Sequence, residues 1–399
     1  MIPRPAPALE LADIIRCHGG VLLNDQAKPL KTEQRRVLRA LASCRTAALG
    51  GHVETCDQCQ HQRIAYNSCR NRHCPKCQGS ACARWMAARE AELLPVEYFH
   101  VVFTLPDVFN SLAVMHPRLF HSTLFKAVAQ TLLEVAANKR NLGARIGFMA
   151  ILHTWGQNLS LHPHLHCVIP GGGLSSDGRS WVGCRPGFFL PVRILSRVFR
   201  GKFVSLLRKA FVRRTDAEFD RLAVEEVITA SVKTQWVVYA KPPFGGPDQV
   251  LKYLSRYTHR IAISNHRLVS IDHQTVTFRW KDYAHGNRPR TMMLGALEFL
   301  RRFLQHVVPR GFVRIRHFGI LSNRHRSDNL KLCRKLLEHA DPPEESAFLE
   351  PSAPALTSIY SLQTDKTGQC PVCGCGRMIK GEAVQRQPLL CFLLRNDSS

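Results

Sequence analysis

The chain has 399 residues, of which 45% are hydrophobic, and 55 Lys and Arg against 30 Asp and Glu give it a formal net charge of +25. This length allows two or three domains with a sizeable core. A one-sided positive charge indicates a polyanionic partner, most often nucleic acid, although a basic soluble protein or one that touches anionic membrane has the same composition. No apolar run approaches the roughly 20 residues of a spanning helix, which excludes an integral membrane protein of that kind.

The N-terminus predicts a cytoplasmic protein, associated with the nucleoid if its partner is DNA. Pro3 and Pro5 interrupt it, and it has no basic segment followed by an apolar one, as a signal peptide would. The 15 cysteines are therefore expected in a reducing compartment. There, clustered pairs of cysteines favour metal sites over disulfides.

Residues 1–50 are predicted to be mostly helical, and two cysteine pairs follow them. The pairs are Cys56-x2-Cys59 and Cys74-x2-Cys77. Each pair forms a tight turn that places two thiolates on one ion, and two such turns complete a tetrahedral structural Zn²⁺ site. The four cysteines are therefore predicted to bind one zinc ion together.

The loop between these pairs contains further candidates. Cys69 and His73 are either bystanders, which is the preferred interpretation, or they replace a ligand or help to bind a second ion. Cations mixed with aromatic rings suit DNA contact, although a zinc ribbon also binds protein. The DNA-binding candidates in or beside this loop are Arg70, Arg72 and Lys76.

Alternating strands and helices follow. Residues 98–106 are predicted to form a strand, 107–140 helices, and 148–159 and 160–170 two antiparallel strands. Residues 192–214 form a very basic amphipathic helix, whose charges are either a solvated face or a phosphate-binding one. Residues 261–271 and 274–280 are expected to form a hairpin that completes the sheet, and 294–307 a helix.

The strand at residues 161–170 carries three histidines at a spacing of two. Alternate side chains of a strand share one face, so His162, His164 and His166 are predicted to point the same way. Neutral imidazoles one residue apart on such a face can hold a divalent metal in common. The alternative is a core strand with incidental histidines.

Two tyrosines lie on a predicted helix that begins near residue 249. Tyr253 and Tyr257 are four residues apart and so share one helix face. Core packing is the commoner reason for such a pair, but Arg256 and Arg260 make this helix cationic, so the phenols could meet a DNA phosphate. A phenol beside a histidine-bound metal suggests attack on a phosphodiester, with a phosphotyrosine as the product.

After about residue 341 the composition changes to a proline-containing linker. Cys370-x2-Cys373 then makes one more metal-binding turn, but no partner pair is evident in the sequence around it. Cys391 is a candidate fourth ligand, and an incomplete or remnant site is the alternative.

Several of these motifs resemble a known family. His164-Leu165-His166 is similar to the His-hydrophobic-His motif of the HUH endonucleases, and residues 253–257 resemble their two-tyrosine helix. The specific resemblance is to transposases of the IS91 family, which join an N-terminal zinc-binding domain to such a catalytic domain. It covers roughly residues 10–325 and includes the stretches 48–53, 66–77, 99–106 and 257–265.

The resemblance implies an α+β fold, with an HUH-type central antiparallel sheet, flanking helices and a small zinc-binding domain. It implies that His164 and His166 bind Mg²⁺ or Mn²⁺ and that both tyrosines are nucleophiles acting on single-stranded element ends and target DNA. In the wider superfamily a third polar residue completes the metal site. We propose His162 for it, with Gln157 and His259 as alternatives.

The expected organisation is a helical and zinc-binding DNA-recognition domain over 1–98, a helical connector over 99–145, a catalytic domain with the tyrosine helix over 146–330, and a tail over 331–399. Oligomeric state is not predicted. The rival functions are a rolling-circle replication initiator, a non-catalytic zinc-dependent DNA-binding protein and a zinc hydrolase. The hydrolase needs an acidic general base near the histidines, where Asp177 is the nearest acid.

Overall fold

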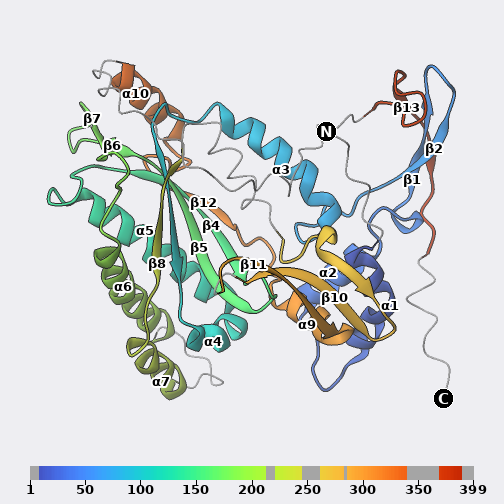
Figure 1. Ribbon diagram of the computed structural model, residues 1–399, viewed down its shortest axis with the longest axis horizontal. Coiled ribbons are helices and arrows are strands. Elements are labelled where there is room, and N and C mark those ends of the chain that lie inside the picture. Colours follow the sequence, from blue (N-terminus) through green and yellow to red (C-terminus); the bar gives the residue numbers. More distant parts are fainter. Residues whose placement is uncertain (1–8, 213–220, 245–260, 283–284, 339–367, 389–399) are drawn as a thin grey trace.

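The computed structural model describes residues 9–212, 221–244, 261–282, 285–338 and 368–388 (Figure 1). Its centre is a five-stranded sheet in the order β12-β4-β5-β3-β8, in which every neighbouring pair is antiparallel. The strands are β3 (Tyr98–Thr104), β4 (Gly147–Trp155), β5 (Leu161–Pro170), β8 (Val238–Phe244) and β12 (Ile315–Gly319). The predicted α+β fold with a central antiparallel sheet and flanking helices is confirmed.

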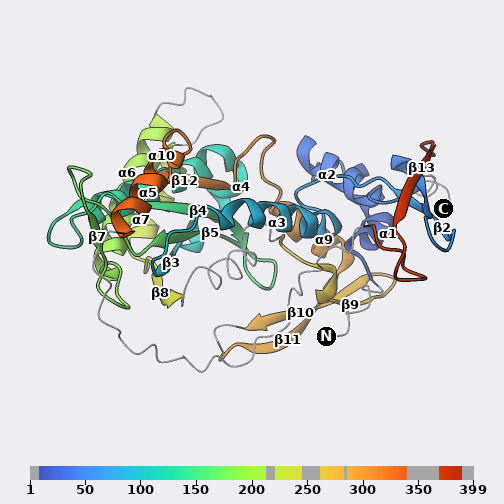
Figure 2. The ribbon, with the colours of Figure 1, turned by 90° about the horizontal axis from the view of Figure 1, so that it is seen from above.

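Helices cover one face of this sheet because alternate strand residues there are large and apolar. Phe103 from β3 and Leu165 from β5 are fully buried in the same core as Phe120 and Phe203 of the covering helices. The predicted helical region over 107–140 is confirmed, and so is the helix predicted from residue 192, as far as residue 212, where the described part ends (Figures 1 and 2). The helices of this layer are α4 (Asn110–Met115), α5 (Pro117–Ala137), α6 (Val192–Val212) and α7 (Arg221–Val232).

A second core joins distant parts of the sequence. Its sheet has the order β11-β10-β9, and Phe278 of that sheet packs edge-on against Phe299 of a neighbouring helix. Leu38 and Ile15, from the N-terminal helices, are buried in the same cluster. The elements that line it are α1 (Leu11–Asn24), α2 (Thr32–Ala42), β9 (Leu268–Ile271), β10 (Thr275–Asp282), β11 (Arg288–Gly295) and α9 (Ala296–Gln305).

The expectation that residues 261–280 complete the histidine sheet is wrong. β9 and β10 do pair as an antiparallel hairpin, but their third strand is β11 and not a strand of the central sheet. The physical reason lies in where their apolar side chains go: Val276 and Phe278 are fully buried against the N-terminal helices and α9. The edges of the central sheet are occupied instead by β8 and β12.

The region around Cys56 and Cys59 forms a third sheet, which is small and combines strands from the N-terminal and C-terminal parts of the sequence. Its order is β13-β1-β2, with β13 antiparallel to β1. The strands are β1 (Gly51–Cys56), β2 (Gln62–Tyr66) and β13 (Met378–Val384), and α3 (Pro75–Glu90) follows the second cysteine pair. The remaining elements are η1 (Ala47–Leu49), η2 (Asp107–Phe109), β6 (Gly172–Leu174), β7 (Trp181–Gly183), η3 (Asn265–Arg267) and α10 (Arg326–Glu338). Over the described ranges, no helix is both long enough and apolar enough to cross a bilayer.

Candidate metal centres

Two histidines of β5, His164 and His166, lie together on the sheet face opposite the one that packs on α5 and α6. The Nε2 atoms of His164 and His166 lie 3.0 Å apart. Two nitrogens bound to one divalent ion at about 2.1 Å and at a right angle are about 3.0 Å apart, so this spacing fits two adjacent ligands. The structure brings these two predicted residues together in the expected way.

The third histidine of the cluster comes from the neighbouring strand. His153 of β4 is the direct cross-strand partner of His164, and its ring centroid lies 4.5 Å from that of His166. One ligand atom of each of His153, His164 and His166 lies within 4.8 Å of the others. The His153 side chain is buried, with 2% exposure, and it stacks on Trp155 at 4.7 Å between ring centroids.

The structure places His153, and not the predicted His162, beside His164 and His166. His162 is not part of the cluster, and its Nδ1 lies 3.5 Å from an Asp107 carboxylate oxygen. The reason is strand geometry: His162 and His166 are four residues apart, roughly 13 Å along the strand, whereas His153 lies directly opposite His164 on the neighbouring strand. Gln157 lies in the turn after β4, where its carbonyl accepts a hydrogen bond from Arg267, and His259 lies outside the described residues.

Hydrogen bonds on the far side of the rings fix which nitrogen faces the centre. His100 of β3 is buried, and its Nε2 lies 2.8 Å from Nδ1 of His166, with the two rings stacked. Nδ1 of His164 donates to the His162 carbonyl at 2.6 Å. In both rings Nε2 is then the atom turned toward the cluster, which is how metal-binding histidines are commonly oriented.

We expect the substitution His100→Phe to lower Mn²⁺ affinity by about 10- to 100-fold, because it keeps a ring at this position but removes the nitrogen that orients His166. Titration calorimetry with Mn²⁺ on the full chain measures the change. The control is His121→Phe, which replaces another buried histidine, packed among Phe120 and Phe312. Equal Mn²⁺ affinity in the two variants would show that His100 does not position a ligand.

The tyrosine segment lies outside the described residues, and with it Tyr253, Tyr257, Arg256 and Arg260. The chain before and after it is described. β8, which ends at Phe244, pairs with β3 of the histidine sheet. After the segment, the Ala262 carbonyl accepts a hydrogen bond of 3.3 Å from Arg267, which also donates to Gln157 in the β4–β5 turn. The described residues that precede and follow residues 245–260 thus contact β3 and the turn between β4 and β5.

A cluster of four thiols lies beside the N-terminal helices. Sγ of Cys44 lies 3.6 Å from that of Cys77 and 3.5 Å from that of Cys74, and Cys69 lies 3.7 Å from Cys77. Four sulfurs bound at about 2.3 Å around a tetrahedral Zn²⁺ are about 3.8 Å apart, whereas a disulfide is near 2.05 Å. The residues fit a structural zinc ion.

The predicted grouping of Cys56, Cys59, Cys74 and Cys77 around one ion is wrong. The structure divides the two pairs between separate clusters: Cys74 and Cys77 join Cys44 and Cys69. Cys69, which was taken for a bystander, belongs to this cluster. The residues after Cys44 and Cys69, Arg45 and Arg70, both have a positive φ, 57° and 50°, which turns the chain back sharply after each sulfur.

Cys56 and Cys59 instead lie beside the cysteine pair of the C-terminal segment. Those four thiols form the second cluster, Cys56, Cys59, Cys370 and Cys373. The C-terminal turn therefore does have a partner pair, which sequence reasoning did not find, and Cys391 lies outside the described residues. His73, the other candidate in the loop, is buried and belongs to neither cluster; its burial lowers its pKa well below the usual value, so it is neutral.

The three predicted DNA contacts near the first cluster have different surroundings. Arg72 donates to the Phe312 carbonyl at 2.5 Å, and Lys76 lies 2.9 Å from Glu10. Arg70 is exposed. The structure therefore gives Arg72 and Lys76 partners within the protein, and leaves Arg70 on the surface.

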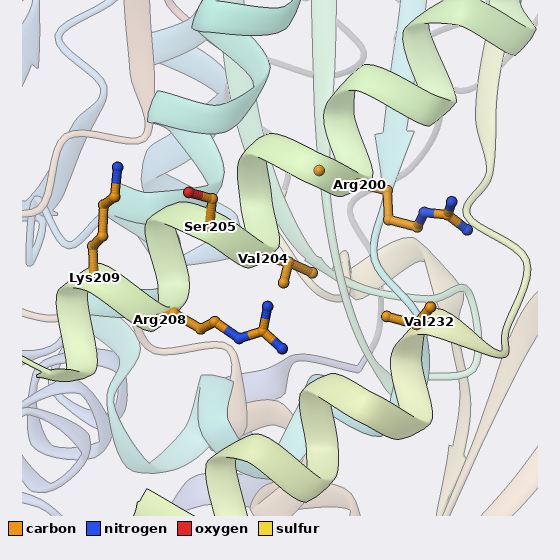
Figure 3. A pocket seen from close by; sticks show the side chains of 7 residues that line it. Arg200, Val204, Ser205, Arg208, Lys209 and Val232 are labelled. Atoms are coloured by element: carbon orange, nitrogen blue, oxygen red, sulfur yellow. The ribbon is translucent and has the colours of Figure 1, made fainter.

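The basic helix α6 presents its cations away from the core. Between α6 and α7 is an open hollow of about 410 Å³ (Figure 3). Two of the α6 cations form ion pairs, Lys202 with Glu134 and Arg208 with Glu225. The hollow is lined by Arg200, Gly201, Val204, Ser205, Arg208, Lys209 and Val232. A hollow lined by three cations, one of which pairs with Glu225, is compatible with both interpretations of this helix, solvated or phosphate-binding.

Comparison with known proteins defines the class. Residues 147–329 match a family profile described as a putative transposase, and residues 14–105 match a transposase zinc-binding domain of the IS91 type. A putative transposase (y4qJ) of Sinorhizobium fredii is 53% identical over 379 residues, which cover 93% of this chain and 94% of that protein. The protein is thus a DNA transposase.

A more distant relative is the transposase for insertion sequence element IS801 of Pseudomonas savastanoi pv. phaseolicola, 26% identical over 399 residues, with 96% of this chain and 90% of that protein covered. The chain belongs to the IS91 family of transposases. Among solved structures, a metal-bound conjugative relaxase in complex with its oriT DNA is 15% identical, with 60% of this chain and 72% of that chain covered and a TM-score of 0.25.

Proposed function

We propose that this transposase is an HUH-type nickase and strand transferase, which cuts and joins single-stranded DNA through a 5′-phosphotyrosine intermediate during rolling-circle transposition. The observation that carries the proposal is the convergence of His153, His164 and His166 on one sheet face, with His100 orienting His166 from behind. Three imidazoles, of which those of His164 and His166 turn Nε2 toward the cluster, are a suitable ligand set for Mg²⁺ or Mn²⁺ that leaves other positions open for phosphate oxygens.

The nucleophiles in this proposal are Tyr253 and Tyr257. The phenol oxygen of one tyrosine attacks the scissile phosphorus, the bond from phosphorus to the 3′ oxygen breaks, and the phenolic proton is lost as the 3′ hydroxyl forms. A phenol with a pKa of about 10 is ionised in only roughly one molecule in a thousand at neutral pH. The divalent ion, when bound, would stabilise the charge that develops on the phosphate.

With two tyrosines, the protein can cleave a DNA strand and later rejoin it without a nucleotide cofactor. The first phosphotyrosine keeps the energy of the broken phosphodiester, because the phosphorus remains esterified. A 3′ hydroxyl can then attack it and restore the DNA backbone. One tyrosine would open the element end and the other would serve strand transfer or termination. In this proposal the zinc-bearing segment over 1–98 recognises DNA, 99–145 connects, 146–330 catalyses, and 331–399 forms the tail.

The test is covalent capture of DNA by the full-length protein. Labelled single-stranded oligonucleotides covering each flank of the element that encodes this chain are incubated with Mn²⁺ or Mg²⁺ and run on a denaturing protein gel. We expect a labelled protein band that disappears with a chelator and is weaker with the same sequence as duplex. Strong DNA binding with no adduct under either metal would contradict the proposal and favour a non-catalytic DNA-binding protein.

A further inference from the structure

The second thiol cluster joins cysteines from opposite ends of the sequence. Sγ of Cys59 lies 3.5 Å from that of Cys370, and Sγ of Cys56 lies 3.7 Å from that of Cys373. These distances are far longer than a disulfide and close to the edge of about 3.8 Å expected for sulfurs around a tetrahedral zinc ion. Cys370 and Cys373 lie beyond residues 14–105, the part of the chain that matches the zinc-binding family profile.

The two cysteine pairs repeat one local structure. The backbone N–H of Gln58 lies 3.4 Å from Sγ of Cys56, and the N–H of Val372 lies 3.4 Å from Sγ of Cys370. The residue after each pair has a positive φ, 57° at Gln60 and 70° at Gly374. Amide hydrogens directed at sulfur stabilise its anionic form, which is the form that binds a metal. Each pair is therefore a complete half of a tetrathiolate site.

Close contacts hold the two halves face to face. The N–H of Arg377 donates to the Asp57 carboxylate at 2.8 Å, and the N–H of Asp57 donates to the Arg377 carbonyl at 3.0 Å. At Gly376 an added Cβ would lie 2.4 Å from Sγ of Cys56, so a residue without a side chain is required there. β13 continues from this contact and pairs with β1 along its length.

The C-terminal segment reaches this place from the other end of the molecule. α10, which ends at Glu338, lies at the far side of the central sheet, and β13 lies at the opposite end of the molecule, beside β1 (Figure 1). The small sheet has limited apolar packing: among the described residues, its buried cluster consists of Cys56, Cys370 and Met378. A metal ion would supply the cohesion that this small core lacks.

We propose that Cys56, Cys59, Cys370 and Cys373 bind a second Zn²⁺, which forms a zinc ribbon from two halves and fastens the C-terminal segment to the β1–β2 hairpin. The protein then carries two structural zinc ions, one within the N-terminal region and one shared between the two ends. This site is independent of the histidine centre and of the proposed strand-transfer chemistry.

The experiment counts zinc per chain by atomic emission on full-length protein purified without added metal. Wild type is expected to hold two ions. The double variant Cys370→Ser, Cys373→Ser is expected to hold one, and so is Cys56→Ser, Cys59→Ser. Because both pairs serve the same ion, the variant with all four substitutions is also expected to retain one. Cys375→Ser, which changes a neighbouring exposed cysteine outside the cluster, is the matched control and keeps two.

Several results would overturn the proposal: a single zinc in wild type, two ions in the variant with four substitutions, none in that variant, or iron in place of zinc. Cobalt substitution of wild type gives a readout that needs no variant, because two tetrathiolate sites give twice the sulfur-to-cobalt absorption of one. Amide hydrogen exchange then distinguishes a local loss of the contact between the C-terminal segment and β1 from a loss of stability of the whole protein. In Cys370→Ser, Cys373→Ser, exchange should rise in β13 and β1 and stay unchanged in β4 and β5, whereas a general rise would mean global destabilisation instead.

Discussion

The double variant Tyr253→Phe, Tyr257→Phe is expected to lose covalent DNA capture by roughly 10³-fold or more, because phenylalanine keeps the ring but has no oxygen to attack phosphorus. The measurement is the labelled adduct on a denaturing gel, with binding of the same oligonucleotide followed by fluorescence anisotropy. We expect binding to change little, because a phenolic hydroxyl contributes far less to affinity than the contacts between protein cations and DNA phosphates.

Tyr239→Phe is the matched control for that experiment. Tyr239 lies on β8 of the same sheet and is 53% exposed, so its hydroxyl is available but the proposal gives it no role. Adduct formation by the control should equal that of wild type. If the double variant still captured DNA, the nucleophile would have to be another residue and the assignment of both tyrosines would fail.

The second large effect is expected at His153. The substitution His153→Gln should reduce both Mn²⁺ affinity and adduct formation by more than about 100-fold. The effect should exceed that of His100→Phe, because His153 is one of the three proposed ligands, whereas His100 only orients a ligand. His162→Gln should reduce either quantity only slightly, because His162 lies outside the cluster and faces Asp107. Titration calorimetry with Mn²⁺ and the adduct assay measure the two quantities on the same preparations.

This pair of variants distinguishes the two candidate third ligands. If His162→Gln lost more Mn²⁺ affinity and adduct formation than His153→Gln, His162 would be the third ligand instead. Thermal unfolding of both variants serves as the control for folding, because His153 also stacks on Trp155 within the structure.

The histidine strand shows how far local pattern alone can predict a site. Period-two spacing was sufficient for the shared face of His164 and His166, because the alternation of side chains is a property of one strand. His153 depends on the register between β4 and β5, which a single sequence does not display. Counting outward from the turn would not have found it: Trp155 opposes Leu161, which would place His153 opposite Pro163, and an irregularity between His153 and Trp155 shifts the pairing to His164.

The zinc sites were predicted less completely, for a similar reason. A Cys-x2-Cys pair is a local structure and was recognised each time, but which pairs share an ion depends on the tertiary fold. The turn at Cys370 meets its partner at Cys56 across most of the chain, and Cys44 has no second cysteine beside it to attract attention. The local sequence is therefore enough to identify each pair as a metal-binding turn. It does not show which other cysteines complete each site.

The core shared by α1, α2 and α9 limits how such transposases can exchange parts. Leu38 and Ile15 from the first fifty residues are buried together with Phe299 and Leu300, more than two hundred residues later. A recombination event between two related elements that joined their genes near residue 98 would bring together halves of two different cores. The hybrid would have cavities and clashes where the partners differ, so N-terminal and catalytic regions are expected to be inherited as one unit.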